Sequence, residues 1–152
     1  MAISQAMCSS FKQQLFLGEH DLDTDVIKIA LYTSSATLGA STTAYTTSDE
    51  VANGNGYTTG GNTLTGASVS LSGTTAFVDF SDTTWAASTI TARGALIYNS
   101  SKSNKAIAVL DFGGDKTSTN GDFTVQMPTN DASNALLRIA RWVLGGRCNR
   151  SL

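Results

Sequence analysis

The feature that most constrains the fold is a pair of apolar runs, residues 95–98 and 106–112, on either side of a short polar connection. The connection, residues 99–104, contains only Asn, Ser and Lys. Apolar β-forming runs bounded by turn residues predict two strands joined by a hairpin. Neither run alternates between apolar and polar residues, so both faces of each strand are expected to be buried. Residues 93–114 therefore predict a hairpin at the centre of a β-rich domain.

The composition suits a β-rich domain with a largely uncharged surface. Of the 152 residues, 41% are hydrophobic and only 14% are charged, whereas soluble domains average about 25% charged residues. Small Thr, Ser, Asn and Gly residues replace the missing charges. This composition is typical of extracellular or virion β proteins, and such a surface is easily covered by a partner. One domain of this size buries roughly 70% of its unfolded surface, so folding requires neither a metal nor a disulfide.

Charge and cysteine content bear on the partners of the chain and on its redox compartment. The formal net charge of −2 argues against nucleic-acid binding by the chain as a whole. Arginines gather toward the C-terminus, at Arg138, Arg141, Arg147 and Arg150. They form either a solvated basic tail or an anchor for an acidic partner surface. Cys8 and Cys148 lie near opposite ends and are expected to be free thiols in a reducing compartment.

The N-terminal residues predict a helix rather than a targeting segment. They lack a basic stretch followed by an apolar run, and no apolar run approaches the ~20 residues of a membrane span. We therefore expect a soluble protein made in the cytoplasm. Residues 4–17 predict a helix within residues 1–18, with Ser4 as its cap and Gly18 as its end. The apolar residues recur every four positions, at Ile3, Met7, Phe11 and Leu15.

The rest of the chain predicts roughly six to eight short strands separated by turn residues. The strand-forming segments are residues 26–33, 57–71, 75–80, 95–98, 106–112, 122–127 and 134–144. Their spacing of roughly 8–12 residues favours an all-β fold, an antiparallel β-sandwich of jelly-roll or Greek-key type with a short N-terminal α-helix. We expect a single domain over residues 1–152, with a C-terminal arm over residues 141–152.

One long connection, residues 34–56, interrupts this pattern. Residues 48–52 predict one helical turn capped by Ser48, which residues 53–56 then end because Asn and Gly tolerate positive φ. Connections of this length are uncommon in compact domains and are usually functional or ordered by a partner.

The single histidine and a cluster of aspartates are the first candidates for chemistry. A Ser-His-Asp triad would need a nucleophile beside His20, but the chain has no G-x-S-x-G nucleophile elbow. His20 is therefore expected in a surface turn. Asp21, Asp23 and Asp25 alternate like the opening of a calcium loop. That loop requires Gly at its sixth position and a bidentate Glu at its twelfth, where this chain has Val26 and Tyr32. A polar turn is therefore expected, with adventitious calcium binding as the alternative.

Other acidic residues and glycine-rich segments give only weak indications of a catalytic or phosphate-binding site. Asp79 with Asp82, or Asp111 with Asp115, would suit glycosidase chemistry only if both carboxylates faced one cleft. The glycine-rich segments, residues 53–61 and 113–114, lack the lysine and helix of a phosphate loop. We expect no catalytic residue, no cofactor and no metal, and therefore a protein that is not an enzyme.

The order of the segments carries a resemblance. A helix is followed by DLDTDVIKIALYTSS, EVANGNGYTTGGNTLTG, AFVDFSDTTW, TARGALIYNSSKSNKAIAVLDFGGDK and STNGDFTVQMPTNDASNALLRIA. This order resembles a family of small virion structural proteins of tailed bacteriophages, of capsid-decoration (cement), head-fibre or tail-associated type. The resemblance covers roughly residues 11–140 and implies a β-sandwich virion component. Residues 141–152 are not part of the pattern.

Among virion components, the leading hypothesis is a capsid-decoration protein that braces the lattice of the major capsid protein. Its expected partners are the major capsid protein and copies of itself, as a homo-oligomer with a trimer as the first guess, without nucleic acid or membrane. Its expected location is the virion, after assembly in the host cytoplasm. One alternative is a tail, fibre or adaptor protein. A remote alternative is a carbohydrate-binding module or small hydrolase that uses Trp85 or Tyr57. The expected contact sites are residues 99–104 and 34–56.

Overall fold

The computed structural model describes residues 2–140, which form two layers of antiparallel strands and one short helix. The first layer is a five-stranded sheet in the order β1-β8-β7-β2-β3. Its strands are β1 (Ala6–Met7), β8 (Lys105–Thr117), β7 (Thr91–Asn99), β2 (Ile27–Tyr32) and β3 (Asn62–Thr63). The predicted all-β sandwich with a short N-terminal helix is confirmed.

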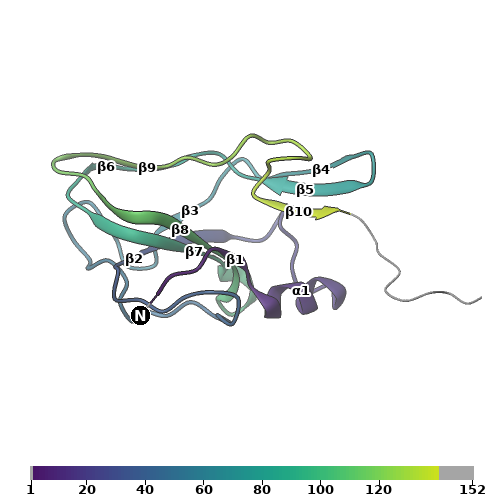
Figure 1. The fold of residues 1–152 in the computed structure, drawn as a ribbon, viewed down its shortest axis with the longest axis horizontal. Helices are drawn as coiled ribbons and strands as arrows, with labels where there is room; N and C mark the ends of the chain where they lie inside the picture. Colours follow the sequence, from purple (N-terminus) through teal and green to yellow (C-terminus); the bar gives the residue numbers. More distant parts are fainter. Residues whose placement is uncertain (1, 141–152) are drawn as a thin grey trace, which may run out of the picture.

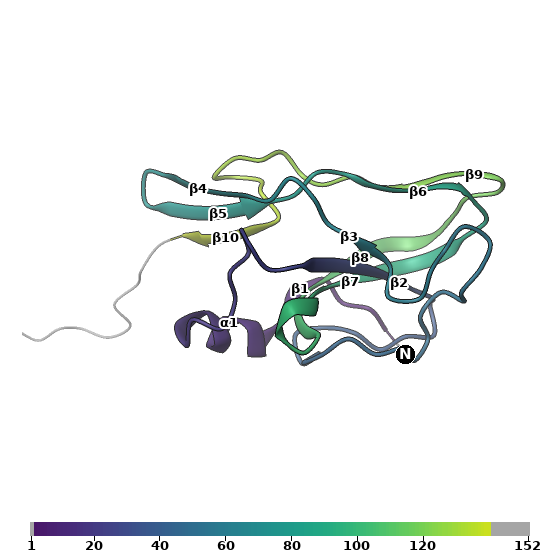
Figure 2. The same cartoon turned by 180° about the vertical axis from the view of Figure 1, so that it is seen from behind.

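The second layer consists of two smaller sheets. One has the order β10-β5-β4, formed by β10 (Leu137–Ala140), β5 (Thr75–Asp79) and β4 (Ser68–Ser72). The other pairs β6 (Thr83–Ser88) with β9 (Gly121–Val125). Figures 1 and 2 show β4, β5, β6 and β9 on one side of the five-stranded sheet, with the helix α1 (Ser9–Phe16) and much of the connection after β2 on the other.

The predicted central hairpin is confirmed. β7 and β8 pair along their length and are joined by a short 3-10 turn, η1 (Ser100–Lys102). Ser103 and Asn104 complete the reversal with φ near 55° and 58°, a conformation that Asn adopts more readily than most residues. Six consecutive residues of β7, from Gly94 to Asn99, are buried. Both faces of the hairpin are therefore covered, as the absence of alternation predicted.

The N-terminal helix is shorter than the predicted residues 4–17, and the assignment of residues 1–18 to a helix is corrected. α1 begins only at Ser9. Before it, Ile3 forms a parallel bridge with Leu38, and β1 pairs with β8. Two of the apolar residues spaced four apart are buried, but they belong to different structures. Ile3 lies in an extended segment and Phe11 in the helix.

The ends of the helix also differ in part from the prediction. Cys8, not Ser4, is the N-cap residue, and it makes no side-chain capping bond. Gly18 ends the helix as predicted, with a φ of 68°. Burial raises the pKa of the Cys8 thiol to about 11. Cys148 lies outside the described residues.

Two further boundaries need correction. Residues 48–52 do not form a helical turn, because Glu50 makes an antiparallel bridge with Tyr32 at the end of β2. The last strand, β10, begins at Leu137 rather than at residue 134 and includes Ile139, to which the predicted strand at least extended; residues 141–144 lie outside the described part of the chain. Within residues 2–140, no helix has the length and apolar character that a membrane crossing needs.

The tight approach of the hairpin strands generates a prediction. A Cβ atom added at Gly94 would lie 2.4 Å from the Leu110 carbonyl oxygen and 2.9 Å from Ile3 Cγ2. Gly94→Ala is therefore expected to lower the free energy of unfolding by about 1–3 kcal/mol, measured by urea denaturation. Gly114→Ala is the matched control in the same hairpin, since its added Cβ meets nothing within 4 Å. Equal losses in the two variants would contradict this account.

Candidate functional site

The long connection after β2 is held by one carboxylate, Glu50. Its Oε1 accepts hydrogen bonds from the Tyr57 hydroxyl at 2.6 Å and from the Gly60 N–H at 2.7 Å. Its Oε2 accepts a hydrogen bond from the Tyr45 hydroxyl at 2.7 Å. The Tyr57 hydroxyl in turn accepts the Leu31 N–H of β2 at 3.0 Å. Glu50 thus ties three points of the connection to the central sheet.

The other two tyrosines of the chain extend this network. The Tyr98 hydroxyl donates to the Gly60 carbonyl at 2.8 Å, and its ring stacks on Tyr45 with centroids 4.6 Å apart. The Tyr32 hydroxyl donates to the Thr46 carbonyl at 2.5 Å. Burial, and secondarily the Glu50 carboxylate, raises the pKa of Tyr98 to about 12. The connection is therefore ordered by the chain's own side chains.

His20 joins α1 to the base of the hairpin tip. The buried Asn99 amide nitrogen lies 3.0 Å from His20 Nδ1, and His20 Nε2 lies 2.8 Å from Gln14 Oε1. An amide nitrogen can only donate, so Nδ1 accepts and Nε2 carries the proton. The pKa of His20 is lowered, first by burial and then by the charge of Lys105. His20 is half-buried and packed edge-on against Phe11, so the expected surface turn is corrected.

The aspartate cluster forms the expected polar turn. Asp21 Oδ1 accepts the N–H groups of Asp23 at 3.1 Å and of Thr24 at 3.3 Å. Asp25 Oδ2 accepts the Asn99 amide at 2.7 Å, and Lys102 lies 3.6 Å from Asp25 Oδ1. Within residues 2–140, no group of three His, Cys, Asp or Glu side chains is arranged to hold a metal ion. The carboxylates serve the turn and the base of the hairpin tip.

Three of the four carboxylates considered for glycosidase chemistry, Asp79, Asp82 and Asp111, make separate local contacts. Buried Asp79 accepts the Phe80 N–H at 2.9 Å, and its other oxygen has no partner within the described residues. Asp82 accepts the Met127 N–H at 2.7 Å. Asp111 pairs with Arg93 at 3.3 Å. Each interaction stabilises a turn or a strand end.

The aromatic residues proposed for sugar binding lie in the core. Trp85 is only 4% exposed and packs against Tyr57 and Phe123, with ring centroids 5.9 and 6.2 Å away. Tyr57 is 2% exposed. Neither ring can serve as a sugar-stacking platform in this conformation, so the carbohydrate-binding alternative loses both of its named residues.

An open apolar cleft lies between α1 and the sheet β10-β5-β4. It encloses about 650 Å³. The strand register places Leu137, Val78 and Val69 in one row across this sheet, and Ile139, Ala76 and Leu71 in the next row on the same face. From the opposite side, the cleft is lined by Met7, Phe11 and Leu15. We call this hollow, together with the sheet face that forms one wall, the apolar cleft.

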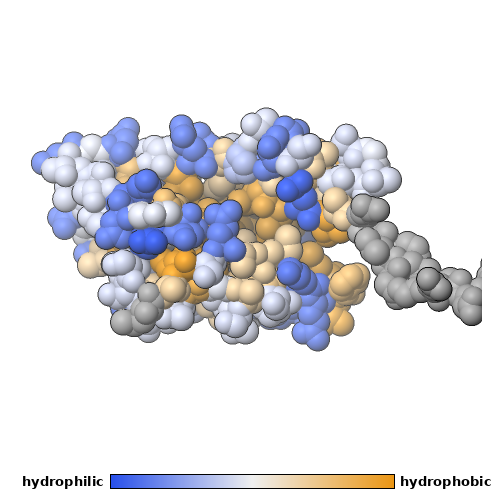
Figure 3. Space-filling model, viewed as in Figure 1, coloured by the Kyte–Doolittle hydropathy of each residue, from blue (hydrophilic) through white to orange (hydrophobic). Residues whose placement is uncertain are grey.

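Large apolar side chains remain exposed around this cleft. Leu71 is 73% exposed, Ile139 61% and Val69 58% on the sheet face. Phe16 and Leu17 at the end of α1 are 95% and 65% exposed. Figure 3 shows hydrophobic residues gathered where the helix and this sheet meet. The alternation of residues 69 and 71 signals such a face, but Phe16 and Leu17 fall outside the predicted helical stripe.

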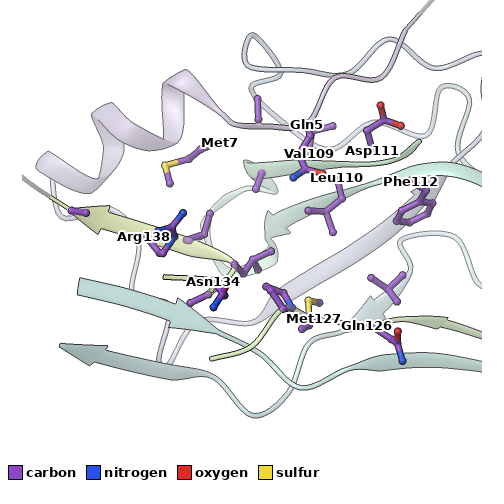
Figure 4. A pocket seen from close by; sticks show the side chains of 18 residues that line it. Gln5, Met7, Val109, Leu110, Asp111, Phe112, Gln126, Met127, Asn134 and Arg138 are labelled. Atoms are coloured by element: carbon purple, nitrogen blue, oxygen red, sulfur yellow. The ribbon is translucent and has the colours of Figure 1, made fainter. Parts of the chain in front are cut away.

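A second hollow of about 800 Å³ lies between β1, β8 and the segments that lead out of β9 and into β10. Its side chains mix amides with apolar groups, including Gln5, Gln126, Leu110 and Met127 (Figure 4). Asp111 is the one carboxylate among its described lining residues, and Arg93 already pairs with it. This lining offers apolar and amide contacts rather than acid–base chemistry.

Comparison of the chain with protein-family models, with curated proteins and with solved structures found no match.

The Glu50 network generates a stability prediction. Glu50→Ala removes three hydrogen bonds to one carboxylate and is expected to lower the free energy of unfolding by about 2–4 kcal/mol. Limited proteolysis should become faster within residues 33–61. Glu50→Gln is the control, because the Gln carbonyl can still accept the bonds made to Oε1, and its loss should be less than half as large. Unchanged stability in Glu50→Ala would show that the network does not hold the connection.

Buried Asp79 generates a pH prediction. Burial raises the pKa of this carboxyl above its usual 3.8, so its contribution favours folding at low pH and is lost as pH rises through the raised value. Asp79→Asn keeps an acceptor for the Phe80 N–H and removes the buried charge. The variant should be more stable than the wild type at pH 7, and this gain should vanish below about pH 4, measured by urea denaturation at several pH values. A less stable variant at pH 7 would contradict the prediction.

Proposed function

We propose that this chain is a non-enzymatic bacteriophage virion protein that decorates the outer capsid and braces the lattice of the major capsid protein. The observation that carries the proposal is the apolar cleft with its exposed rim, including Leu71, Ile139 and Phe16. Large apolar side chains that stay exposed together around a cleft mark contacts with other proteins. The order of the segments resembles that of small phage virion proteins and supports two kinds of partner in a capsid, neighbouring copies of this chain and the major capsid protein.

The ordered loops support the same function. The Glu50 network holds residues 33–61 in one conformation, and the Asp25–Asn99 contact anchors the base of the hairpin tip. A surface that is ordered before binding loses little conformational entropy when it docks. Bracing would act by mass action, because each bound copy favours the assembled shell over its separated subunits.

The test compares particles assembled with and without this chain. A protein that binds only the assembled lattice at 100 times its dissociation constant adds about 2.7 kcal/mol per site. The disruption temperature of the capsid, followed by calorimetry or release of packaged DNA, should therefore rise when the chain is present. Unchanged disruption would contradict bracing.

Copy number separates the capsid from the tail. A decoration protein repeats with the capsid lattice, so on the order of hundreds of copies per particle are expected. Quantified gel bands of purified particles give this number. A handful of copies, set by the rotational symmetry of the tail, would instead favour a tail, fibre or adaptor role.

A further inference from the structure

We propose that the apolar cleft of one copy receives residues 141–152 of a second copy, so that exchanged arms join the chains into an oligomer. The inference deepens the proposed function and rests on its self-association part alone, not on the contact with the capsid. It assigns an occupant to the largest group of exposed apolar side chains in residues 2–140.

The first step is the place where the arm starts. β10 pairs antiparallel with β5, and Ala140 lies opposite Thr75, the first residue of β5. Gly73 and Thr74 form the turn that joins β4 to β5. The chain's own sheet therefore has no strand residue left to pair with residues that follow Ala140. Ile139 lines the cleft, and Ala140 lines the second hollow. The described chain therefore ends beside the cleft, at the end of its own sheet.

The second step is the chemistry of the arm. Its sequence, RWVLGGRCNRSL, contains three consecutive large apolar residues, Trp142, Val143 and Leu144. Burial of such side chains is the dominant favourable contribution to association. The cleft supplies matching apolar walls, and its 650 Å³ is in the range of pockets that enclose ligands of several side chains' size.

Charge complementarity is the third step. Asp21 and Asp23 lie at the cleft's edge, and both are exposed. The arm carries Arg141, Arg147 and Arg150. Two carboxylates at one edge of the apolar cleft thus match a segment with an apolar centre and basic flanks. Such pairs at a rim steer association and fix orientation more than they add affinity.

The final step is the choice of a second copy over the same chain. Trp142 follows Ala140 by two residues, which span at most about 7 Å. The first residues of the arm that readily permit a tight reversal are Gly145 and Gly146, after the apolar triplet. Docking in its own cleft would require the chain to turn back at Arg141. A neighbouring copy requires no such turn, and extended residues 141–152 reach up to about 40 Å.

The experiment uses the full chain and two substitutions on opposite sides of the proposed contact. Trp142→Ser removes the anchor from the arm, and Leu71→Asp places a charge on the cleft wall. Each should weaken self-association at least about 30-fold, as expected for an interface anchor, measured by sedimentation velocity over a concentration series. Ser72→Asp is the matched control, because Ser72 is exposed on the opposite face of the same strand, and it should associate like the wild type.

A peptide supplies the second readout. A synthetic peptide of residues 141–152 should dissociate the wild-type oligomer, and the same peptide with Trp142→Ser should not. Thermal unfolding of each variant checks the fold, and Leu71→Asp should unfold like the wild type because the side chain is 73% exposed.

Two outcomes would overturn the inference. An oligomer that resists both Trp142→Ser and Leu71→Asp would associate through another surface, which leaves self-association standing without arm exchange. A wild-type monomer at every concentration, with the tryptophan emission of Trp142 shifted to the blue, would place the arm in its own cleft. Neither outcome depends on the capsid disruption test, so the two proposals fail separately.

Discussion

The rest of the structure depends on a central hairpin that must be covered on both faces. β7 and β8 bring apolar side chains to both sides of the five-stranded sheet, and β2 adds another strand of the same kind. A β-sandwich normally covers one face of each sheet and leaves the other to water. This chain covers one face with the β6–β9 layer, through Trp85 and Phe123, and the other with α1, its N-terminal segment and a long connection.

The long connection after β2 covers one face of the central sheet, so its backbone N–H and C=O groups need hydrogen-bond partners. Glu50 provides part of them. A segment without regular strands has backbone N–H and C=O groups that no ladder satisfies, and leaving them unpaired under a covered surface is costly. The Glu50 carboxylate accepts the Gly60 N–H and orients two tyrosine hydroxyls, and Tyr98 donates to the Gly60 carbonyl. The apolar bodies of these tyrosines cover the sheet while their hydroxyls satisfy the connection. One half-buried acceptor therefore lets an irregular segment serve as a wall of the core.

The sequence predicted the elements whose signal is local and missed those that depend on distant partners. Continuous apolar runs identified β7 and β8, and alternation identified β2, β5 and β9. The helix start was wrong because a four-residue apolar spacing suits either a helix or an extended segment that crosses a core, and only the pairing of Ile3 with Leu38 distinguishes them. Glu50 was missed for a related reason. Only two glutamates occur in the chain, but nothing local shows that tyrosine hydroxyls surround one of them.

The apolar cleft exists because the short helix α1 packs on the central sheet and covers only part of the sheet β10-β5-β4. α1 has eight residues, a length of about 12 Å, and it reaches both the edge of the central sheet and one wall of the cleft. It buries Phe11 there, but it cannot also cover the far rows of the sheet β10-β5-β4, where Leu71 and Ile139 stay exposed. The strand register places these two residues on one face of the sheet, and no local sequence pattern shows that the cover of this face is incomplete. Phe16 and Leu17 instead end the helix as exposed apolar residues, so within residues 2–140 the short helix leaves this face of the sheet uncovered.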